Sequence, residues 1–117
     1  MLYGAQRPTG ETDIYFTRSY NLGDNWTSAC RVSDEVNARY KFMPALTVDN
    51  VTGIIYGAYY SRASAEENLT DVYLIYSVDN GTSFKHKKIS STSFAVTDKV
   101  GEYISIDAYR GIISVTW

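Results

Sequence analysis

The sequence predicts an all-β fold made of four-stranded antiparallel sheets that stack face to face. Three observations predict it: a repeat with a spacing of 58 residues, strand-type runs separated by turn residues, and runs that are apolar on both faces. The chain has 117 residues, of which 44% are hydrophobic and 21% charged, as in folded globular domains. We therefore expect a folded repeat array rather than a disordered chain.

The repeat is clearest in residues 12–19, TDIYFTRS, which return as TDVYLIYS at residues 70–77. Two further pairs of segments keep the spacing of 58 residues, namely 43–49 with 101–107 and 53–55 with 111–113. Three matches at one spacing indicate a true internal repeat, and a repeat of this length is typical of stacked supersecondary units.

Each unit is predicted to contribute four strands, because runs rich in Tyr, Ile, Val and Thr alternate with clusters of Gly, Asn, Asp and Ser. The complete unit spans residues 42–90, with strands predicted at 44–48, 54–60, 72–76 and 84–89. A partial unit spans 1–41, with strands at 2–6, 14–18 and 28–32, and a second spans 91–117, with strands at 103–107 and 112–117. The Tyr-Gly-Ala of residues 3–5 recurs at 56–58 and supports the first of these strands.

The run at residues 54–60 is apolar on both faces, whereas a strand with one face in water alternates. Since no helices are predicted, other sheets must cover it, and repeated four-stranded sheets stacked face to face form a β-propeller. About two blades are too few to close a propeller, so we expect either a longer chain or assembly of copies. The leading prediction is a homotrimer that closes a six-bladed ring, in which one strand, 2–6 or 112–117, is in surplus.

Each third strand is followed by a patterned turn, SYNLGDNW at residues 19–26 and SVDNGTSF at 77–84. A short Asp or Asn side chain can bond turn amides, Gly accepts a positive φ, and the aromatic residue packs the turn onto its sheet. The pattern resembles the Asp-box, Ser-x-Asp-x-Gly-x-Thr-Trp, of the sialidase-like BNR-repeat β-propeller family. Asn21 and Asn25 depart from it in the first turn, and Ser83 and Phe84 in the second. The motif marks Ser19, Asn21, Gly23, Trp26, Ser77, Asp79, Gly81 and Phe84 as structural turn residues.

The resemblance covers nearly the whole chain and implies that the Asp-box turns lie on the face away from an active site. Family sialidases use three arginines for the substrate carboxylate, a Tyr–Glu pair as nucleophile and an aspartate as acid/base. None of the six arginines here matches a family catalytic motif, so the catalytic residues stay unknown. Two functions remain open: a carbohydrate-related binding module without its own complete catalytic set, or a fragment or divergent member of a sialidase-like exo-glycosidase.

The loops opposite the turns, at residues 33–41, 61–69 and 90–100, carry the candidate binding residues. The simpler interpretation is that their charges, Lys41 among them, are solvated loop charges. The more specific interpretation is a sugar-binding rim formed by these loops, in which a Tyr stacks on a sugar ring and an Arg pairs with a carboxylate. The candidates for this rim are Arg39, Tyr40, Arg62, Glu102 and Tyr103.

Charge and cysteine content argue against several other functions. A net charge of -2 provides no basic surface for nucleic acid, and the one cysteine, Cys30, cannot form an intrachain disulfide. Neither Cys30 nor His86 has a visible catalytic partner, and Asp79 alone falls short of the 6–8 oxygen ligands of Ca²⁺, so we predict no metal or cofactor. No apolar run reaches the roughly 18 residues of a membrane span, and no signal peptide is apparent. We expect a soluble chain of unknown location, with a secreted or periplasmic parent protein left open.

Overall fold

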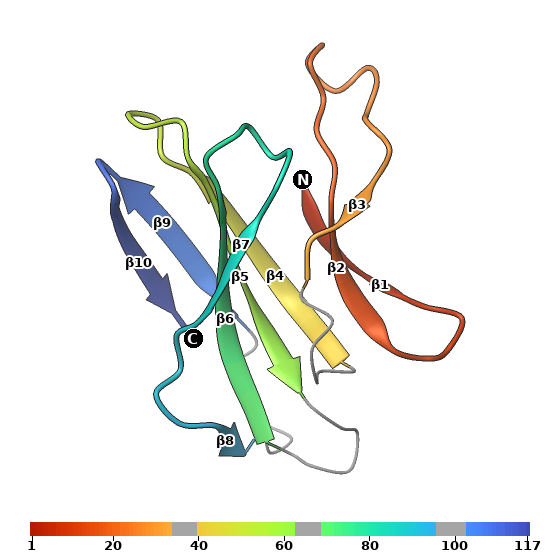
Figure 1. Cartoon of the computed structure of the whole chain (residues 1–117), viewed down its shortest axis with the longest axis vertical. Helices are drawn as coiled ribbons and strands as arrows, with labels where there is room; N and C mark the ends of the chain where they lie inside the picture. The colour runs from red at the N-terminus through yellow and green to blue at the C-terminus, as the bar shows by residue number, and fades with distance from the viewer. Residues whose placement is uncertain (34–39, 63–68, 96–102) are drawn as a thin grey trace.

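The computed structural model describes residues 1–33, 40–62, 69–95 and 103–117, and every regular element within these ranges is a β-strand. Figure 1 shows three groups of strands side by side, in chain order. The first group is β1 (Leu2–Gln6), β2 (Thr12–Phe16) and β3 (Cys30–Arg31). The second is β4 (Tyr40–Val48), β5 (Ile55–Arg62), β6 (Leu69–Ser77), β7 (Lys85–Lys88) and the short β8 (Phe94–Ala95), and the third is β9 (Ser105–Tyr109) and β10 (Ile112–Thr116). This part of the chain has no helix able to cross a membrane.

Strands within each group are antiparallel neighbours in chain order, β1-β2-β3, β4-β5-β6-β7 and β9-β10, while β8 pairs with the start of β6. One parallel pair, Thr12 with Tyr40, joins the first group to the second. The all-β class is thus confirmed, and the middle group has the predicted four strands. Its first strand begins at residue 40 rather than 44, with a register shift between Phe42 and Ala45. Met43 has a φ of 50° there and Pro44 has no N–H for the ladder, which accounts for the irregularity.

The middle group is covered on both faces, as the apolar run of β5 predicts. On one face Ile14, Phe16 and Val32 of the first group form a buried cluster with Ile55, Tyr59 and Ile75. On the other face Ile106 and Ala108 of the third group form a second cluster with Tyr56, Ala58 and Leu74. Residues 55–61 of β5 are consequently all buried. Strands rather than helices therefore cover both faces of β5, although the first group belongs to the same eight-stranded sheet as β5 and the third group forms a two-stranded sheet of its own.

The third group has a different pattern, because exposed residues alternate with buried ones in β9 and with partly buried ones in β10. Its exposed positions carry mainly polar residues: Ser105, Asp107, Tyr109, Ile112, Ser114 and Thr116. Such alternation is typical of a sheet with one face in solvent. The composition of this outer face does not require a further covering sheet, so closure of a six-bladed ring by three copies stays a prediction.

The register of β1 corrects one inference from the sequence. Tyr3 lies opposite Tyr15, whose repeat counterpart Tyr73 lies opposite Tyr59. The two ring pairs are stacked alike, each with 5.9 Å between centroids. Tyr3 therefore occupies the place of Tyr59, three residues from the Tyr56 that the Tyr-Gly-Ala match aligns with it. An odd shift turns a side chain to the other face of a sheet, so strand pairing follows the buried face rather than the short match.

Candidate functional site

The second Asp-box turn, between β6 and β7, is held by its own side chains. Ser77 Oγ donates to Asp79 Oδ1 at 2.7 Å and accepts the Gly81 N–H at 2.8 Å. The Asp79 carboxylate accepts the N–H groups of Thr82 at 3.1 Å and Ser83 at 2.9 Å, and also the Ser83 hydroxyl. The Ser83 hydroxyl and amide, followed by Ser77, hold the pKa of Asp79 well below its usual range. These bonds engage both Asp79 oxygens within the turn, which agrees with a structural role.

The first Asp-box turn, after β2, has the same plan with neutral residues. Ser19 Oγ donates to Asn21 Oδ1 at 2.9 Å and accepts the Gly23 N–H at 2.8 Å. Asn21 Oδ1 accepts the Asn25 N–H at 2.9 Å, as Asp79 does for residue 83. Asn thus replaces Asp without loss of the backbone bond, since only an acceptor oxygen is needed.

The aromatic residues of the two turns lie in different surroundings. Phe84 packs edge-on against Phe16 of β2 with 5.1 Å between ring centroids, so the second turn contacts the neighbouring group. Trp26 instead folds over its own turn, donating from Nε1 to the Gly23 carbonyl at 3.0 Å, and remains 50% exposed. The sequence predicts that each aromatic residue packs its turn onto its own sheet, whereas Phe84 contacts Phe16 of the neighbouring group and Trp26 contacts its own turn.

The starts of β2, β4 and β6 and the end of β5 lie at the end of the molecule opposite the two turns, as the strand pairings require. At this end Thr12, Tyr40, Phe42 and Arg62 line a pocket of about 440 Å³. Tyr40 is the cross-strand partner of Arg62, and the Arg62 guanidinium lies 5.7 Å from the Phe42 ring centroid. Arg62 Nε is buried, and no hydrogen-bond acceptor among the described residues reaches it. This pocket, called the rim pocket below, combines aromatic walls with an unsatisfied cationic donor.

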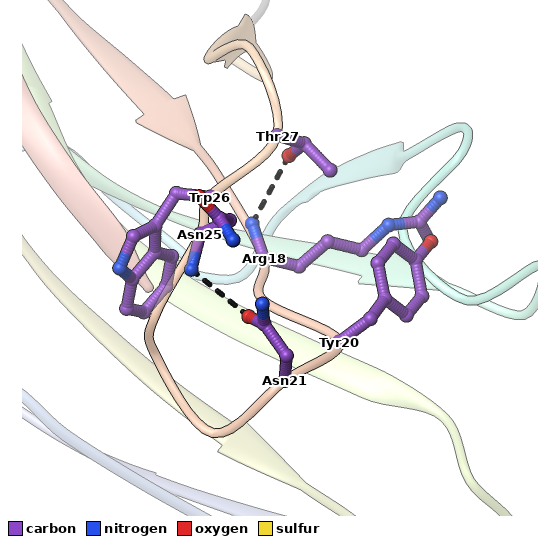
Figure 2. Close-up of a pocket in the computed structure, with 6 residues that line it drawn as sticks. All are labelled: Arg18, Tyr20, Asn21, Asn25, Trp26 and Thr27. Carbon is purple, nitrogen blue, oxygen red and sulfur yellow. Dashed lines mark hydrogen bonds between the residues drawn. The ribbon is translucent and has the colours of Figure 1, made fainter.

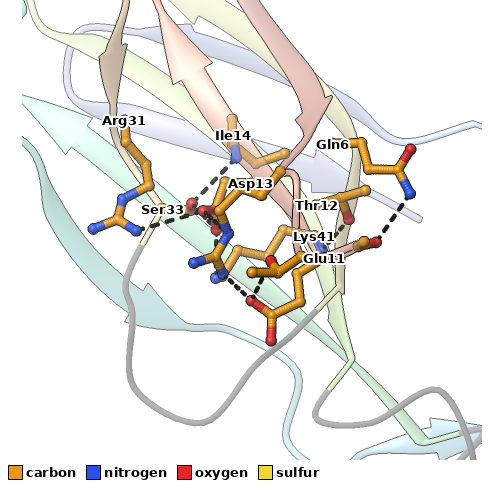
Figure 3. A network of polar contacts seen from close by, with 11 residues as sticks. Gln6, Glu11, Thr12, Asp13, Ile14, Arg31, Ser33 and Lys41 are labelled. Carbon is orange, nitrogen blue, oxygen red and sulfur yellow. Dashed lines mark hydrogen bonds and ion pairs between the residues drawn. The ribbon is translucent and has the colours of Figure 1, made fainter.

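A buried ion network supports one wall of the rim pocket (Figure 3). Asp13, fully buried, contacts Lys41 Nζ at 2.8 Å, Arg7 Nε at 3.0 Å and Arg31 Nη1 at 3.5 Å, and accepts the Ser33 hydroxyl at 3.0 Å. Burial opposes ionisation, but Lys41, Ser33 and Arg7 together lower the pKa of Asp13. The network therefore keeps a charged carboxylate inside the protein.

The same network joins β2 to β4 beside the rim pocket. The Lys41 N–H donates to Thr12 Oγ1 at 3.0 Å, and Thr12 is itself a wall residue of the pocket. The side chain of Lys41 is only 2% exposed, so its interpretation as a solvated loop charge is wrong. A sequence signal was present, because the Asp13–Ser33 pair recurs as Asp71–Ser90, but nothing local marks Lys41 as their partner.

The predicted rim residues do not all meet. Tyr40 and Arg62 share the rim pocket, whereas Tyr103 is 81% exposed ahead of β9 and does not line it. Arg39 and Glu102 lie outside the described residues. Phe42 and Thr12, which sequence reasoning missed, complete the pocket because strand pairing brings them beside Arg62.

His86 and Cys30 lie along the seam between the first two groups, away from the rim pocket. His86 Nε2 contacts the Val32 carbonyl oxygen, and the Cys30 thiol lies 3.6 Å from the Phe16 carbonyl oxygen. The His86 contact links the first two groups, and the Cys30 contact links two strands of the first group. These contacts form no catalytic pair. Within the described ranges no group of three or more His, Cys, Asp and Glu side chains could hold a metal ion.

Comparison of the sequence with models of protein families and with curated proteins finds no match. The resemblance to the Asp-box family therefore depends on the two turns and on the repeat of 58 residues.

Proposed function

We propose that this chain is a segment of an Asp-box β-propeller that binds carbohydrate at the rim pocket, with an acidic sugar as the ligand. The three stacked groups of strands would then be one complete blade between two partial ones. Support comes from the cover of β5 on both faces and from the matching hydrogen bonds of the two turns. The four-stranded unit between residues 40 and 88 is the size expected of one blade.

The observation that carries the ligand class is the position of Arg62. Its guanidinium lies over Phe42, and its buried Nε lacks an acceptor among the described residues. A buried donor without a partner is costly, and a ligand that supplies an acceptor removes that cost. A carboxylate suits a guanidinium best, because two parallel N–H···O bonds can form. A sugar acid also provides a ring that can lie against Tyr40.

Binding fits the pocket better than hydrolysis does. Glycoside hydrolases of the usual kind place two carboxyl groups on either side of the scissile bond. None of the described residues that line the rim pocket carries a carboxylate, and Asp13 nearby is engaged by Lys41 and Arg7. We therefore assign to the rim pocket the recognition of an acidic sugar.

The proposal is tested by titrating the protein with glucuronate and with glucose while recording NMR chemical shifts. We expect Arg62→Met, which keeps the apolar stem on Phe42, to weaken glucuronate binding by about tenfold to a hundredfold, the size of a lost charged hydrogen bond. Arg110→Met is the matched control, because Arg110 lies over Tyr109 at 5.1 Å in another part of the chain. Equal binding of glucose, or unchanged affinity in Arg62→Met, would contradict the proposal. Turnover of a fluorogenic sialoside by the wild-type chain would instead favour the exo-glycosidase.

A further inference from the structure

A second pocket lies beside the first Asp-box turn, at the end of the molecule opposite the rim pocket. It has a volume of about 310 Å³ and is shown in Figure 2. Its lining residues are Arg18, Tyr20, Asn21, Asn25, Trp26 and Thr27. It shares no residue with the rim pocket, and it is called the turn pocket below.

Arg18 is the cation of the turn pocket. Its guanidinium lies 4.9 Å from the Tyr20 ring centroid, which orients the plane of the group. Arg18 Nη1 is buried, and no hydrogen-bond acceptor in the described part of the chain reaches it. Arg18 also has no ion pair with any described carboxylate. The turn pocket thus contains a preoriented cationic donor that requires an acceptor.

Tyr20 lies beside the Arg18 guanidinium, and Trp26 lies on the opposite side of the turn (Figure 2). Tyr20 is 69% exposed and Trp26 is half exposed, so two rings face solvent within one small pocket. Asn21 uses its Oδ1 to accept from Ser19 and from the Asn25 N–H, which leaves its Nδ2 to donate. Rings that can stack on a sugar, together with a few fixed polar groups, are the usual make-up of a small-ligand site.

The turn itself does not need these side chains. The positions 58 residues later are Tyr76 for Arg18, Val78 for Tyr20 and Phe84 for Trp26, and the second turn forms the matching bonds from the Gly81 and Ser83 amides without them. There the aromatic residue is packed against Phe16, and no arginine is present. Arg18, Tyr20 and the open face of Trp26 are therefore additions to the turn rather than parts of it.

We propose that the turn pocket is a second ligand site, which binds an oxyanion carried on a sugar ring. Arg18 would hold the oxyanion, a carboxylate or a sulfate ester, of one sugar, with Asn21 Nδ2 donating to a hydroxyl group. Trp26, on the opposite side of the turn, would stack on the ring of a neighbouring sugar in the same oligosaccharide. The site does not depend on the rim pocket, so either can fail alone. With both pockets occupied, one protein chain could bind two acidic sugars of the same polysaccharide. The second sugar would then bind more tightly, because the first contact raises its effective concentration at the second pocket.

The fluorescence of Trp26 reports on this site, because the chain has two tryptophans and Trp117→Phe leaves Trp26 as the only one. The Trp117→Phe protein is titrated with a glucuronic acid trimer, a sulfated glucose trimer and an unmodified glucose trimer. We expect a saturable change of Trp26 emission with the acidic ligands, and comparison of the first two identifies the preferred oxyanion. Arg18→Met in this background should weaken the response at least tenfold, whereas Arg110→Met, at an arginine that lines neither pocket, should leave it unchanged.

Circular dichroism of each variant establishes that it is folded. If Arg18→Met does not fold, Tyr20→Leu replaces it, because this change removes the ring beneath the guanidinium and should weaken binding several-fold. No emission change with either acidic trimer, an equal change with the neutral trimer, or an equal response in both Arg18→Met and Arg110→Met would overturn the proposal. A shift of Trp26 emission that follows protein concentration without ligand would also overturn it, since the occupant would then be another protein chain.

Discussion

The two Asp-box turns share the bonds that join the serine to the residues two and four positions later, Ser19 to Asn21 and Gly23 and Ser77 to Asp79 and Gly81, but they have opposite surroundings. In the second, Gly81 and Phe84 both lie against Phe16 of the neighbouring group. In the first, Gly23 has only Trp26 of its own turn nearby, and Trp26 is half exposed. The comparison teaches that the motif determines the turn, while the neighbouring sheet determines whether its aromatic residue serves packing or remains open to a ligand.

Two aspartates related by the repeat, Asp13 and Asp71, likewise share a local hydrogen bond and differ in their surroundings. Each accepts a hydroxyl hydrogen bond at 3.0 Å from the serine that follows its outer strand, Ser33 or Ser90. Asp13 is buried among Lys41, Arg7 and Arg31, whereas Asp71 is half-buried and pairs with Lys88 at 2.8 Å. The serine bond comes from the repeat, whereas the buried Lys41 comes from the neighbouring group and Arg7 and Arg31 come from the group of Asp13 itself.

The largest expected effect tests this second contrast. Asp13→Asn keeps the shape of the side chain but removes the buried negative charge that contacts Lys41, Arg7 and Arg31, so we expect a loss of about 3–5 kcal/mol in the free energy of unfolding. The matched change Asp71→Asn should cost less than about 1 kcal/mol, because Lys88 can turn to water. Urea unfolding at pH 7 measures both. Equal losses would show that the cations around Asp13 add nothing beyond the shared serine bond.

A smaller effect distinguishes the two turn glycines. Both have positive φ, 80° at Gly81 and 98° at Gly23, so alanine is strained by about 1–2 kcal/mol at either position. A Cβ on Gly81 would also lie 2.5 Å from Phe16 Cε1, and such overpacking adds about 1–3 kcal/mol. At Gly23 the nearest atom is Trp26 Cζ2 at 4.0 Å. Gly81→Ala should therefore lower the urea midpoint more than Gly23→Ala, and the reverse order would mean that the contact with Phe16 is not tight.

The smallest effect concerns Asp49, which links the second group to the third. Its carboxylate accepts the Val51 N–H at 2.9 Å and, across the groups, the Gly111 N–H at 2.6 Å. Burial opposes ionisation, but these amides with Thr52 outweigh it and lower the pKa of Asp49 from 3.8 to about 2. The unfolded chain takes up its proton first as the pH falls, so stability should decrease between about pH 4 and pH 2.

Urea midpoints measured across this pH range test the link. Asp49→Asn should lower stability at neutral pH and make its decrease toward pH 2 shallower. Asp107→Asn, the same change at the repeat position in the third group, should leave the steep decrease in place, because Asp49 is still present. An unchanged pH profile in Asp49→Asn would contradict the role of the bond to Gly111.

Local chemistry was predictable from the sequence. The strand at residues 2–6 and the pair at the carboxyl end of the chain lie where the runs of β-forming residues predict them. Both turns form the bonds expected of Ser, Asp or Asn, and Gly, because all the partners lie within eight consecutive residues. Cover of both faces of β5 also followed from its composition, since an apolar run cannot leave either face in water.

The candidate site was only half predictable. Tyr40 and Arg62 were chosen as loop residues with suitable side chains, and they meet because β4 and β5 pair at that position. Nothing in the sequence marked Phe42 and Thr12 as pocket residues. Tyr103 has a ring that could stack on a sugar, but it lies outside the pocket. The residue types therefore suggested the candidates, and the strand register determined which of them line the pocket.

The sequence by itself determined the repeat, the strand runs and the internal bonds of the turns, because each depends on residues close together in the chain. Only the tertiary structure decided that Lys41 is buried against Asp13, that Tyr3 takes the place of Tyr59, and that Trp26 stays open while Phe84 is covered. These outcomes depend on which faces of separate sheets meet and in which register. The stabilisation from such a contact depends on the neighbouring residue as much as on the residue itself. Similar local sequences can therefore lie in different environments.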